Sequence, residues 1–378
     1  MAPEITKPAG FALRAEWPLA ISLLTVGAFF FWGEAILARV PEPIWLALIF
    51  LWLVVVILLS AFAIVRHAEC LALKMGEPVG TLILTLAVTG IEVMMISASM
   101  ATGKGSPTLA RDAMFSVVMI VLNGLVGLSL LLGALRYREQ AYNLQGAGVY
   151  LAMIASLAVL GLILPNFTVA TAGPTLSTTQ GILLGLMSVG LYATFLFAQT
   201  ARHREYFLDL NPAGEPAAEN EHSGLVVRSV PFHAALLFCY LVPLVILSKK
   251  LAIPIDHGVR ELGAPPELGG FIIAVLVLSP EGFSGLRAAI QNKLQRSVNL
   301  LLGSVLATIG LTIPSVFAIG ALSGKSVILG LNPADSTLLA LTLAISFITF
   351  SSRRTNVIFG AVHLVLFLAY LIMIFDGQ

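Results

Sequence analysis

Two glutamates lie in the middle of two hydrophobic segments, one in each half of the chain. Glu92 stands in GTLILTLAVTGIEVMMISASM, and Glu281 stands in GGFIIAVLVLSPEGFSGLRAAI. A carboxylate at bilayer depth is costly unless it faces a partner, a cation or a water-filled path, so such acids are functional candidates. Carboxylates are hard ligands that suit Ca²⁺, Na⁺ or K⁺. The pair therefore predicts a transporter with both glutamates as ligands of a metal cation.

The residues just before each glutamate are candidate ligands too. They are Thr89 and Gly90 in the first half, and Ser279 and Pro280 in the second. Pro or Gly beside a small hydroxyl residue loosens the helical hydrogen-bond ladder, and the freed carbonyls coordinate cations in broken transporter helices. A structural alternative is that each glutamate is protonated and hydrogen-bonded to a neighbouring helix. Equivalent positions in two halves favour the cation site.

Further polar side chains occur in the middle of hydrophobic segments. Asn123 lies in VVMIVLNGLVGL, and Ser304, Thr308 and Thr312 follow one another at i+4 spacing on one helix face. Hydrogen bonding between packed helices is an equally good explanation for the hydroxyl residues. We expect Asn123, Ser304 and Thr308 to contribute to the cation and proton site.

The remaining polar residues have structural interpretations. Asp112 follows KGSPTLAR and is expected to cap a helix, and His363 is expected to be a packing residue. Cys70 and Cys239 are far apart and predict neither a disulfide nor a zinc site. The sequence contains no HExxH, GxSxG or CxxC motif, so we expect no enzyme and no resident cofactor. The transported cation and protons are the expected ligands.

The composition is that of a protein embedded in lipid. The chain has 378 residues, of which 58% are hydrophobic and 11% are charged, and its mean hydropathy is +0.96. Soluble domains have about a quarter of their residues charged. The net charge of +1 gives no reason to expect nucleic acid as a partner. The lipid bilayer, inorganic cations and protons are the expected partners, and a homo-oligomer is compatible with the sequence.

About eleven stretches are long and apolar enough to cross a bilayer, which needs about 20 residues. The fold class is therefore an all-α polytopic membrane protein. The expected spans are 18–38, 44–65, 79–101, 113–135, 147–164, 180–200, 230–248, 268–287, 298–320, 335–351 and 355–375.

One long polar stretch divides these spans into two groups of five after an extra first helix. We expect an N-terminal region at 1–43, a first repeat at 44–200, an acidic linker at 201–229 and a second repeat at 230–378. Five spans are an odd number, so the second repeat would enter the membrane upside down, which is the inverted-repeat plan of secondary transporters.

A local alignment supports the repeat. When residues 77–94 are placed on 266–283, Glu92 falls on Glu281. Identities are few, but the deeply placed acid of each half is in register.

The distribution of Lys and Arg predicts the orientation. Most of the 21 Lys and Arg residues fall in connections on one side if the N-terminus is cytoplasmic. We therefore expect an integral protein of a bacterial inner membrane, with a cytoplasmic N-terminus, a cytoplasmic linker and the C-terminus outside.

Two long segments resemble the signature regions of a known family. HAECLALKMGEPVGTLILTLAVTGIEVMMISASM and LVLSPEGFSGLRAAIQNKLQRSVNLLLGSVLATIGLTIPS are similar to those of ChaA-type calcium/proton antiporters in the cation/calcium exchanger superfamily. The resemblance implies that the two glutamates are the paired ion-binding acids. The first region reads TGIE where many relatives have a GNxxEH or PE-type motif, so the preference among Ca²⁺, Na⁺ and K⁺ stays open.

The expected function is that of a secondary active antiporter that exchanges cytoplasmic Ca²⁺, or alternatively Na⁺ or K⁺, for protons. Protons and the cation would compete for one central site, with alternating access from the two sides. An intramembrane acid/base enzyme and a passive cation channel are the alternatives. The basic residues lie in the connections rather than at membrane depth, which counts against the enzyme. A channel would conduct without coupling the cation to protons.

Overall fold

The computed structural model describes residues 16–76, 83, 86–87, 89–96, 107–208, 227–261, 263–323, 327–352 and 354–375. The described part of the first half contains α2 (Trp17–Ala38), α3 (Pro43–Met75), α5 (Leu109–Val118), η1 (Met119–Leu125), α6 (Val126–Tyr137), β1 (Gln140–Ala141), α7 (Leu144–Ala158), η2 (Val159–Ile163), η3 (Leu164–Phe167), α8 (Thr178–Phe197), η4 (Ala198–Arg202) and η5 (Arg204–Tyr206). The second half contains α9 (Val230–Glu261), α10 (Leu268–Ile290), α11 (Leu294–Ser323), α12 (Pro333–Thr349), β2 (Arg354–Thr355) and α13 (Val357–Phe375). The two short strands pair antiparallel with each other.

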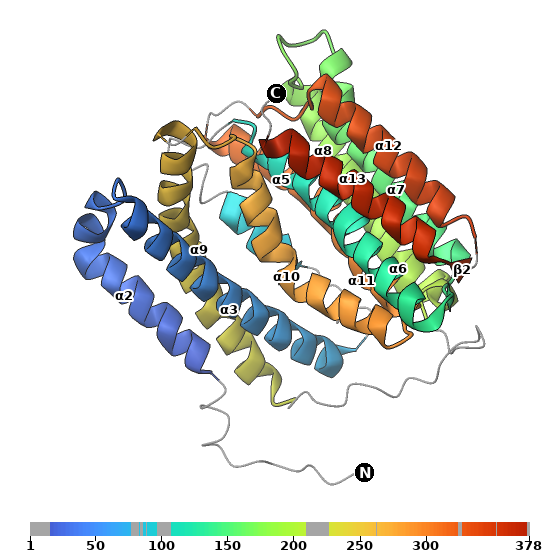
Figure 1. Cartoon of the computed structure of the whole chain (residues 1–378), viewed down its shortest axis with the longest axis horizontal. Coiled ribbons are helices and arrows are strands. Elements are labelled where there is room, and N and C mark those ends of the chain that lie inside the picture. The colour runs from blue at the N-terminus through green and yellow to red at the C-terminus, as the bar shows by residue number, and fades with distance from the viewer. Residues whose placement is uncertain are drawn as a thin grey trace.

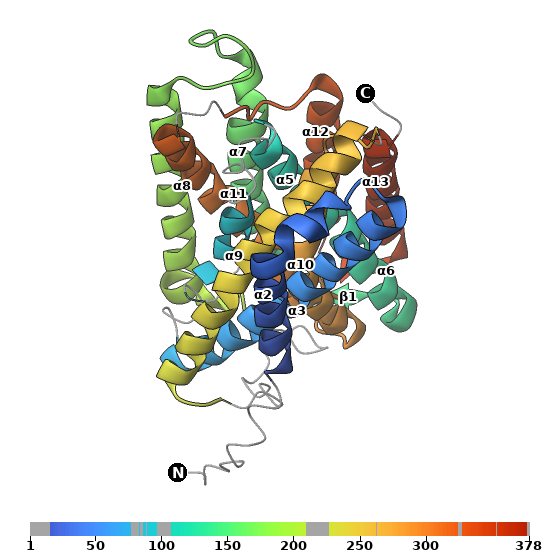
Figure 2. The same cartoon turned by 90° about the vertical axis from the view of Figure 1, so that its left-hand side faces the viewer.

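The helices form three groups side by side (Figure 1), and Figure 2 views the molecule from the side on which α2, α3 and α9 lie. On one side α2, α3 and α9 pack together, and on the other side α6, α7, α8, α12 and α13 gather. Between them lie α5, α10 and α11, and α10 contacts both α5 and α11. The two helices that carry the second glutamate and the hydroxyl series are therefore central elements of the molecule.

Among the described residues, nine helices are long and apolar enough to cross a membrane. The expected span at 335–351 corresponds to α12, which is apolar but has only 17 residues. The expected span at 79–101 lies partly outside the described residues, and residues 89–96 of it are helical. The all-α polytopic fold class is confirmed, whereas the division into two repeats and a linker stays a prediction.

Two helices are longer than the sequence predicts. The sequence places the end of the second span near residue 65, yet α3 continues to Met75 over 33 residues. Helix α9 continues through Pro254 to Glu261. The polar residues HAEC after residue 65 look like a connection in a hydropathy profile, but they lie within α3, where His67 is buried against His233 of α9. This extension brings His67 and Glu69 into the helical part of the molecule.

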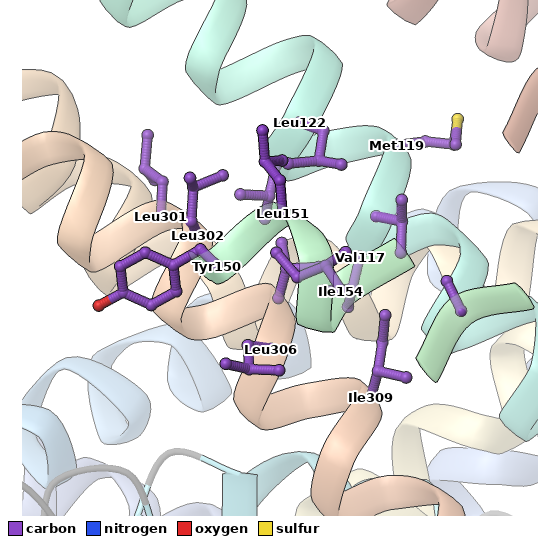
Figure 3. Close-up of a cluster of buried hydrophobic side chains, with 14 of the residues drawn as sticks. Val117, Met119, Leu122, Tyr150, Leu151, Ile154, Leu301, Leu302, Leu306 and Ile309 are labelled. Carbon is purple, nitrogen blue, oxygen red and sulfur yellow. The ribbon is translucent and has the colours of Figure 1, made fainter. Parts of the chain in front are cut away.

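The apolar core fixes the direction in which α11 presents its polar residues. Leu302, Leu306 and Ile309 are fully buried against side chains of α5, η1 and α7 (Figure 3). At about 100° per residue these positions lie on the face of α11 opposite Ser304 and Thr308. Burial of the leucine face therefore turns the hydroxyl face toward α10 and the helix at 89–96.

Candidate functional site

Glu281 projects from the middle of α10 into a partly open environment. Its side chain is half-buried, and its Oε2 accepts a hydrogen bond from the Ser304 hydroxyl of α11 at 3.3 Å. Helix α10 reaches its neighbours closely because Gly270 contacts the backbone of α5, where a Cβ would meet the Ala113 amide nitrogen at 2.7 Å. The helix that carries this glutamate is thus held between α5 and α11.

Glu92 lies in the helical residues 89–96 and is almost completely sealed from solvent. It is 1% exposed, and its Oε2 accepts a hydrogen bond from the Thr308 hydroxyl at 2.7 Å. Its Oε1 is buried and has no hydrogen-bond partner in the described part of the chain. A buried polar atom without a partner is costly, so this oxygen is positioned for a ligand or carries a proton.

Helix α11 brings the two glutamates together. Ser304 and Thr308 are one helical turn apart, so their Cβ atoms are about 5–6 Å from each other on one face, and each binds a different glutamate. The two carboxylates also interact electrostatically. The structure therefore unites Glu92, Glu281, Ser304 and Thr308, and the fully buried Thr312 continues the same face.

The neighbours of Glu92 include a polar atom that faces a cavity. The Thr89 side chain is 3% exposed, lines the cavity described below, and has a hydroxyl with no hydrogen-bond partner among the described residues. Gly90 is helical, and among the described residues a Cβ there would meet only the Met94 side chain, at 3.8 Å. Thr89 is thus available to a ligand, while the packing of the described residues does not require glycine at position 90.

The neighbours of Glu281 lie within a continuous helix. The hydroxyl of Ser279 donates to the Val275 carbonyl one turn earlier. Pro280 lies inside α10 without ending it, and because proline has no N–H, the Leu276 carbonyl one turn earlier lacks its helical donor. The helix is therefore not broken here, and the available oxygen is a backbone carbonyl rather than the serine hydroxyl.

A cavity of about 250 Å³ leads to Glu281 from one end of the helices. Besides Glu281, its polar lining includes Glu69, Thr89, Arg296 and Thr308. The walls come from the later half of α3, the end of α8 and the beginning of α11. Glu92 is not among the lining residues, so the cavity reaches one glutamate directly and stops beside the other.

A second cavity, of about 290 Å³, lies at the other end of the helices. It is formed by the later half of α9, the beginning of α10 and the residues around Leu109, and it reaches Met95. Met95 is one turn beyond Glu92 and is 2% exposed. The glutamates thus lie between two cavities, and the first cavity is the one that contacts the site.

Asn123 lies in a different polar cluster. Its amide nitrogen donates to the Thr342 hydroxyl of α12 at 2.8 Å, and its Oδ1 lies 3.2 Å from Nδ1 of His363 on α13. The other ring nitrogen of His363 lies 3.0 Å from the Thr349 hydroxyl. Asn123 occupies the π-helical segment η1, and it is absent from the lining of both cavities. The structure therefore brings it together with α12 and α13 rather than with the glutamates.

Comparison with known proteins identifies the family of this chain. The family model described as "Sodium/calcium exchanger protein" matches residues 45–201 and 232–375. The chain belongs to the sodium/calcium exchanger family. It is 44% identical over 328 residues to the putative ionic transporter y4hA of Sinorhizobium fredii, covering 85% of this chain and 88% of the relative.

Another relative and one solved structure cover the exchanger almost completely. This chain is 39% identical over 360 residues to the sodium-potassium/proton antiporter ChaA of Escherichia coli, and the match covers 95% of this chain and 96% of the relative. The crystal structure of the Ca²⁺/H⁺ antiporter YfkE has a TM-score of 0.71 with 18% identity, covering 96% of this chain and 100% of that one. Family membership and nine apolar helices in the described residues make the exchanger an integral membrane protein.

Sequence reasoning missed an acidic residue of the exchanger's first cavity. Glu69 lies there with Glu281, and the two carboxylates interact electrostatically, as do Glu69 and Arg296. Glu69 was outside the predicted span because the HAEC segment lowers the local hydropathy. The signal that could have found Glu69 is the helical spacing of the apolar residues before it. Ile57, Ile64 and Val65 are buried on the same uninterrupted helix, and Glu69 follows Val65 by one helical turn.

Proposed function

We propose that this exchanger is a secondary antiporter that carries an inorganic cation, Ca²⁺, Na⁺ or K⁺, out of the cytoplasm in exchange for protons. The observation that carries the proposal is the meeting of a buried and a half-buried glutamate from separate helices at adjacent hydroxyl groups of α11. Hard oxygen ligands of this kind bind these cations. The Escherichia coli relative and YfkE, whose names specify cation/proton antiport, support the same reaction.

Exchange follows from the electrostatics of the shared site. Two ionised carboxylates in a low-dielectric interior repel each other and are poorly solvated. A cation removes the repulsion, and in its absence protons do so. The site is therefore loaded with either a cation or protons before it crosses, because crossing empty would expose charge at membrane depth. Coupled exchange is the consequence.

The proposed ligands are the carboxylates of Glu92 and Glu281, the hydroxyls of Thr89 and Thr308, and the Ser304 hydroxyl. Among these proposed ligands, Oε1 of Glu92 and the Thr89 hydroxyl are buried oxygens that lack a hydrogen-bond partner in the described part of the chain. A bound cation would satisfy both. The carbonyls near Gly90 and Pro280 complete the proposed set.

Alternating access is supported by the two separate cavities. The first cavity contacts Glu281, whereas the second ends at Met95. The first cavity lies at the C-terminal ends of α3 and α8 and at the N-terminal end of α11. Lys and Arg residues are concentrated there, so in the proposed orientation the cavity faces the cytoplasm. The conformation is then the one that accepts a cation from the cytoplasm.

The packing of the helices is compatible with an inverted repeat. Helix α3 packs against α9, and α8 packs against α11 as α13 packs against α6. In the proposed correspondence of the two halves, α3 corresponds to α9, α8 to α13 and α6 to α11. The α3–α9 contact therefore corresponds to itself, and the α8–α11 contact corresponds to the α13–α6 contact. This pairing supports rocking of one group of helices past the other as the change of access.

Flux in liposomes tests the proposal. Purified protein is reconstituted, a pH gradient is imposed, and Ca²⁺, Na⁺ or K⁺ is supplied in turn on the opposite side while proton and cation movements are recorded. We expect proton movement only when a transported cation is present. Proton or cation current without the other ion would refute an antiporter and favour a channel.

Two variants and a matched control make the same experiment specific to the site. Glu92→Gln and Glu281→Gln each keep the side-chain shape but remove the charge, so we expect exchange to be abolished. Glu34→Gln changes an exposed glutamate of α2 and should exchange like the unaltered protein. Normal exchange by either site variant, in folded protein, would refute the assignment of that glutamate.

A further inference from the structure

A buried cluster of polar side chains joins the start of α2 to α3 and α9, outside the transport site. Oε2 of Glu16 accepts hydrogen bonds from Arg66 at 2.7 Å and from the Tyr240 hydroxyl at 2.8 Å. Nε2 of His67 lies 3.3 Å from the same oxygen. Nδ1 of His67 lies 2.9 Å from Nδ1 of His233. The two histidines are 2% and 3% exposed.

The partners of these rings determine which nitrogens carry protons. The backbone amide of Arg228 can only donate, and it donates to Nε2 of His233 at 2.9 Å. The proton of a neutral His233 is therefore on Nδ1, which donates to Nδ1 of His67. The proton of His67 must then be on Nε2, where it points to Glu16. Nη2 of Arg66 also lies 3.3 Å from this ring nitrogen, but it already donates to both Glu16 oxygens. The three contacts form one chain of donors and acceptors that is complete when both rings are neutral.

This chain has no position for another proton. A proton added to His233 would occupy Nε2 and face the Arg228 amide at 2.9 Å. A proton added to His67 would occupy Nδ1 and face the Nδ1–H of His233, also at 2.9 Å. In both cases two donors point at each other. Protonation of either ring therefore breaks one of the two contacts that join α3, His233 and the Arg228 backbone.

The surrounding charges oppose an additional positive charge. The groups that interact with the two rings are Glu16 from the start of α2, Arg66 from α3, and Arg228 from the segment before α9. The Tyr240 hydroxyl of α9 binds Glu16 rather than the rings. The single carboxylate is already paired with Arg66 through both of its oxygens. A histidinium would add a second positive charge beside one anion.

The histidine pair lies behind a wall of the first cavity. Val65 and Glu69 line that cavity two residues before and after His67 on α3. His67 points to the opposite side, toward α9. We propose that His67 and His233 are positioning residues whose neutral pair holds this wall of α3 against α9, and that acid on the cavity side opens the pair and slows exchange. The effect on exchange rests on the proposed function, whereas the opening of the pair does not.

Hydrogen–deuterium exchange on the full-length protein tests the opening directly. Amide exchange in residues 61–70 and 230–240 is measured from about pH 8 to about pH 4, which extends below the range of an ordinary histidine because the surroundings of the two buried rings oppose protonation, and corrected for the intrinsic pH dependence. We expect local protection in both segments to fall about tenfold as the pH decreases, because a buried hydrogen bond is lost. Protection that stays constant over this range would overturn the proposal, whatever the transport assay shows.

Substitution by glutamine separates titration from hydrogen bonding. A glutamine amide can accept at its oxygen and donate at its nitrogen, but it gains no proton in this range. In His67→Gln, His233→Gln and the double variant we expect protection to become independent of pH. His257→Gln on α9, outside the cluster, should retain the dependence of the unaltered protein. A double variant with an unchanged pH dependence would refute the pair as its source.

The liposome assay then links the pair to transport. With cavity-side pH varied and the cation saturating, we expect the acid-induced loss of exchange to be smaller in the glutamine variants than in the unaltered protein and in His257→Gln. An equal loss in all five proteins would show that the pair does not control transport. An unaltered protein with no exchange at any pH would instead remove the proposed function and leave the deuterium result to decide the structural role of the pair.

Discussion

The two glutamates occupy matching places in the sequence, but their surroundings differ. Glu281 is half-buried, lines a cavity and accepts a hydrogen bond of 3.3 Å from Ser304. Glu92 is 1% exposed, lines neither cavity and accepts a hydrogen bond of 2.7 Å from Thr308. The two glutamates are thus equivalent in the sequence but not in the structure, where Glu281 is accessible from a cavity and Glu92 is sealed from solvent.

This difference has a simple physical interpretation. In a transporter with alternating access the shared site opens to one side at a time, so in each conformation it must be closed toward the far side. The first cavity opens toward Glu281 and the second is closed at Met95. In the opposite conformation we expect Glu92 to gain access through the second cavity. The following experiments test the difference between the two acids.

The largest difference is expected when the two supporting hydroxyls are removed. Thr308→Val preserves shape but leaves the buried carboxylate of Glu92 without its donor, which costs about 1–3 kcal/mol, or on the order of five- to hundredfold in the KM for the cation. Ser304→Ala should raise KM only about two- to fivefold, because its bond is longer and water in the cavity can replace it. Cation-dependent exchange in liposomes measures both values.

Equal changes in KM for these two variants would contradict the asymmetry. Ser315→Ala provides a control on the same helix, because the Ser315 hydroxyl donates to the Leu311 carbonyl and does not contact either glutamate. Its KM should match that of the unaltered protein.

A smaller difference is expected in chemical labelling of the acids. A hydrophobic carbodiimide reacts with protonated carboxyl groups that it can reach, and mass spectrometry locates the product. With the protein in the conformation described here, Glu281 should be labelled at least about tenfold faster than Glu92, since a sealed group reacts only after local opening. A saturating transported cation should protect Glu281, whereas labelling of the exposed Glu34 should not change. Comparable labelling of both site acids would show that the cavity does not define access.

Hydropathy and the intramembrane acids predicted the class of this protein from its sequence, and the structure shows why some details were beyond that reasoning. The pairing of Ser304 with Glu281 and of Thr308 with Glu92 depends on which face of α11 is buried, and the leucine pattern contained that information. The length of α3 did not follow from hydropathy, because Arg66 and His67 are polar residues whose partners, Glu16 and His233, are distant in the chain.

Asn123 shows the limit of reasoning from depth alone. An amide in the middle of a span has the same hydropathy signal whether it binds an ion or joins two helices. Only the three-dimensional packing places Asn123 beside Thr342 and His363. The sequence gives no local pattern that pairs it with these residues, because Thr342 and His363 lie more than two hundred positions further along the chain.

The smallest effect on transport is therefore expected at Asn123. Asn123→Ala should leave the KM for the cation unchanged, because neither cavity is lined by this residue. It should lower stability by about 1–3 kcal/mol, since the Thr342 hydroxyl and a ring nitrogen of His363 lose a buried partner. The expected decrease in Tm is about 2–6 °C, measured by the fluorescence of purified protein in detergent.

A double-mutant cycle with Thr342→Val decides between a helix tie and an ion ligand. If Asn123 and Thr342 stabilise the fold through their mutual hydrogen bond, the two losses of stability should be less than additive. The pair Asn123→Ala and Ser156→Ala supplies the control, because the Ser156 hydroxyl donates to the Ala152 carbonyl on α7 and shares no partner with Asn123. A rise in KM of about tenfold with an unchanged Tm would instead place Asn123 among the ligands of the cation, and the transport site would then extend from the glutamates to α12 and α13.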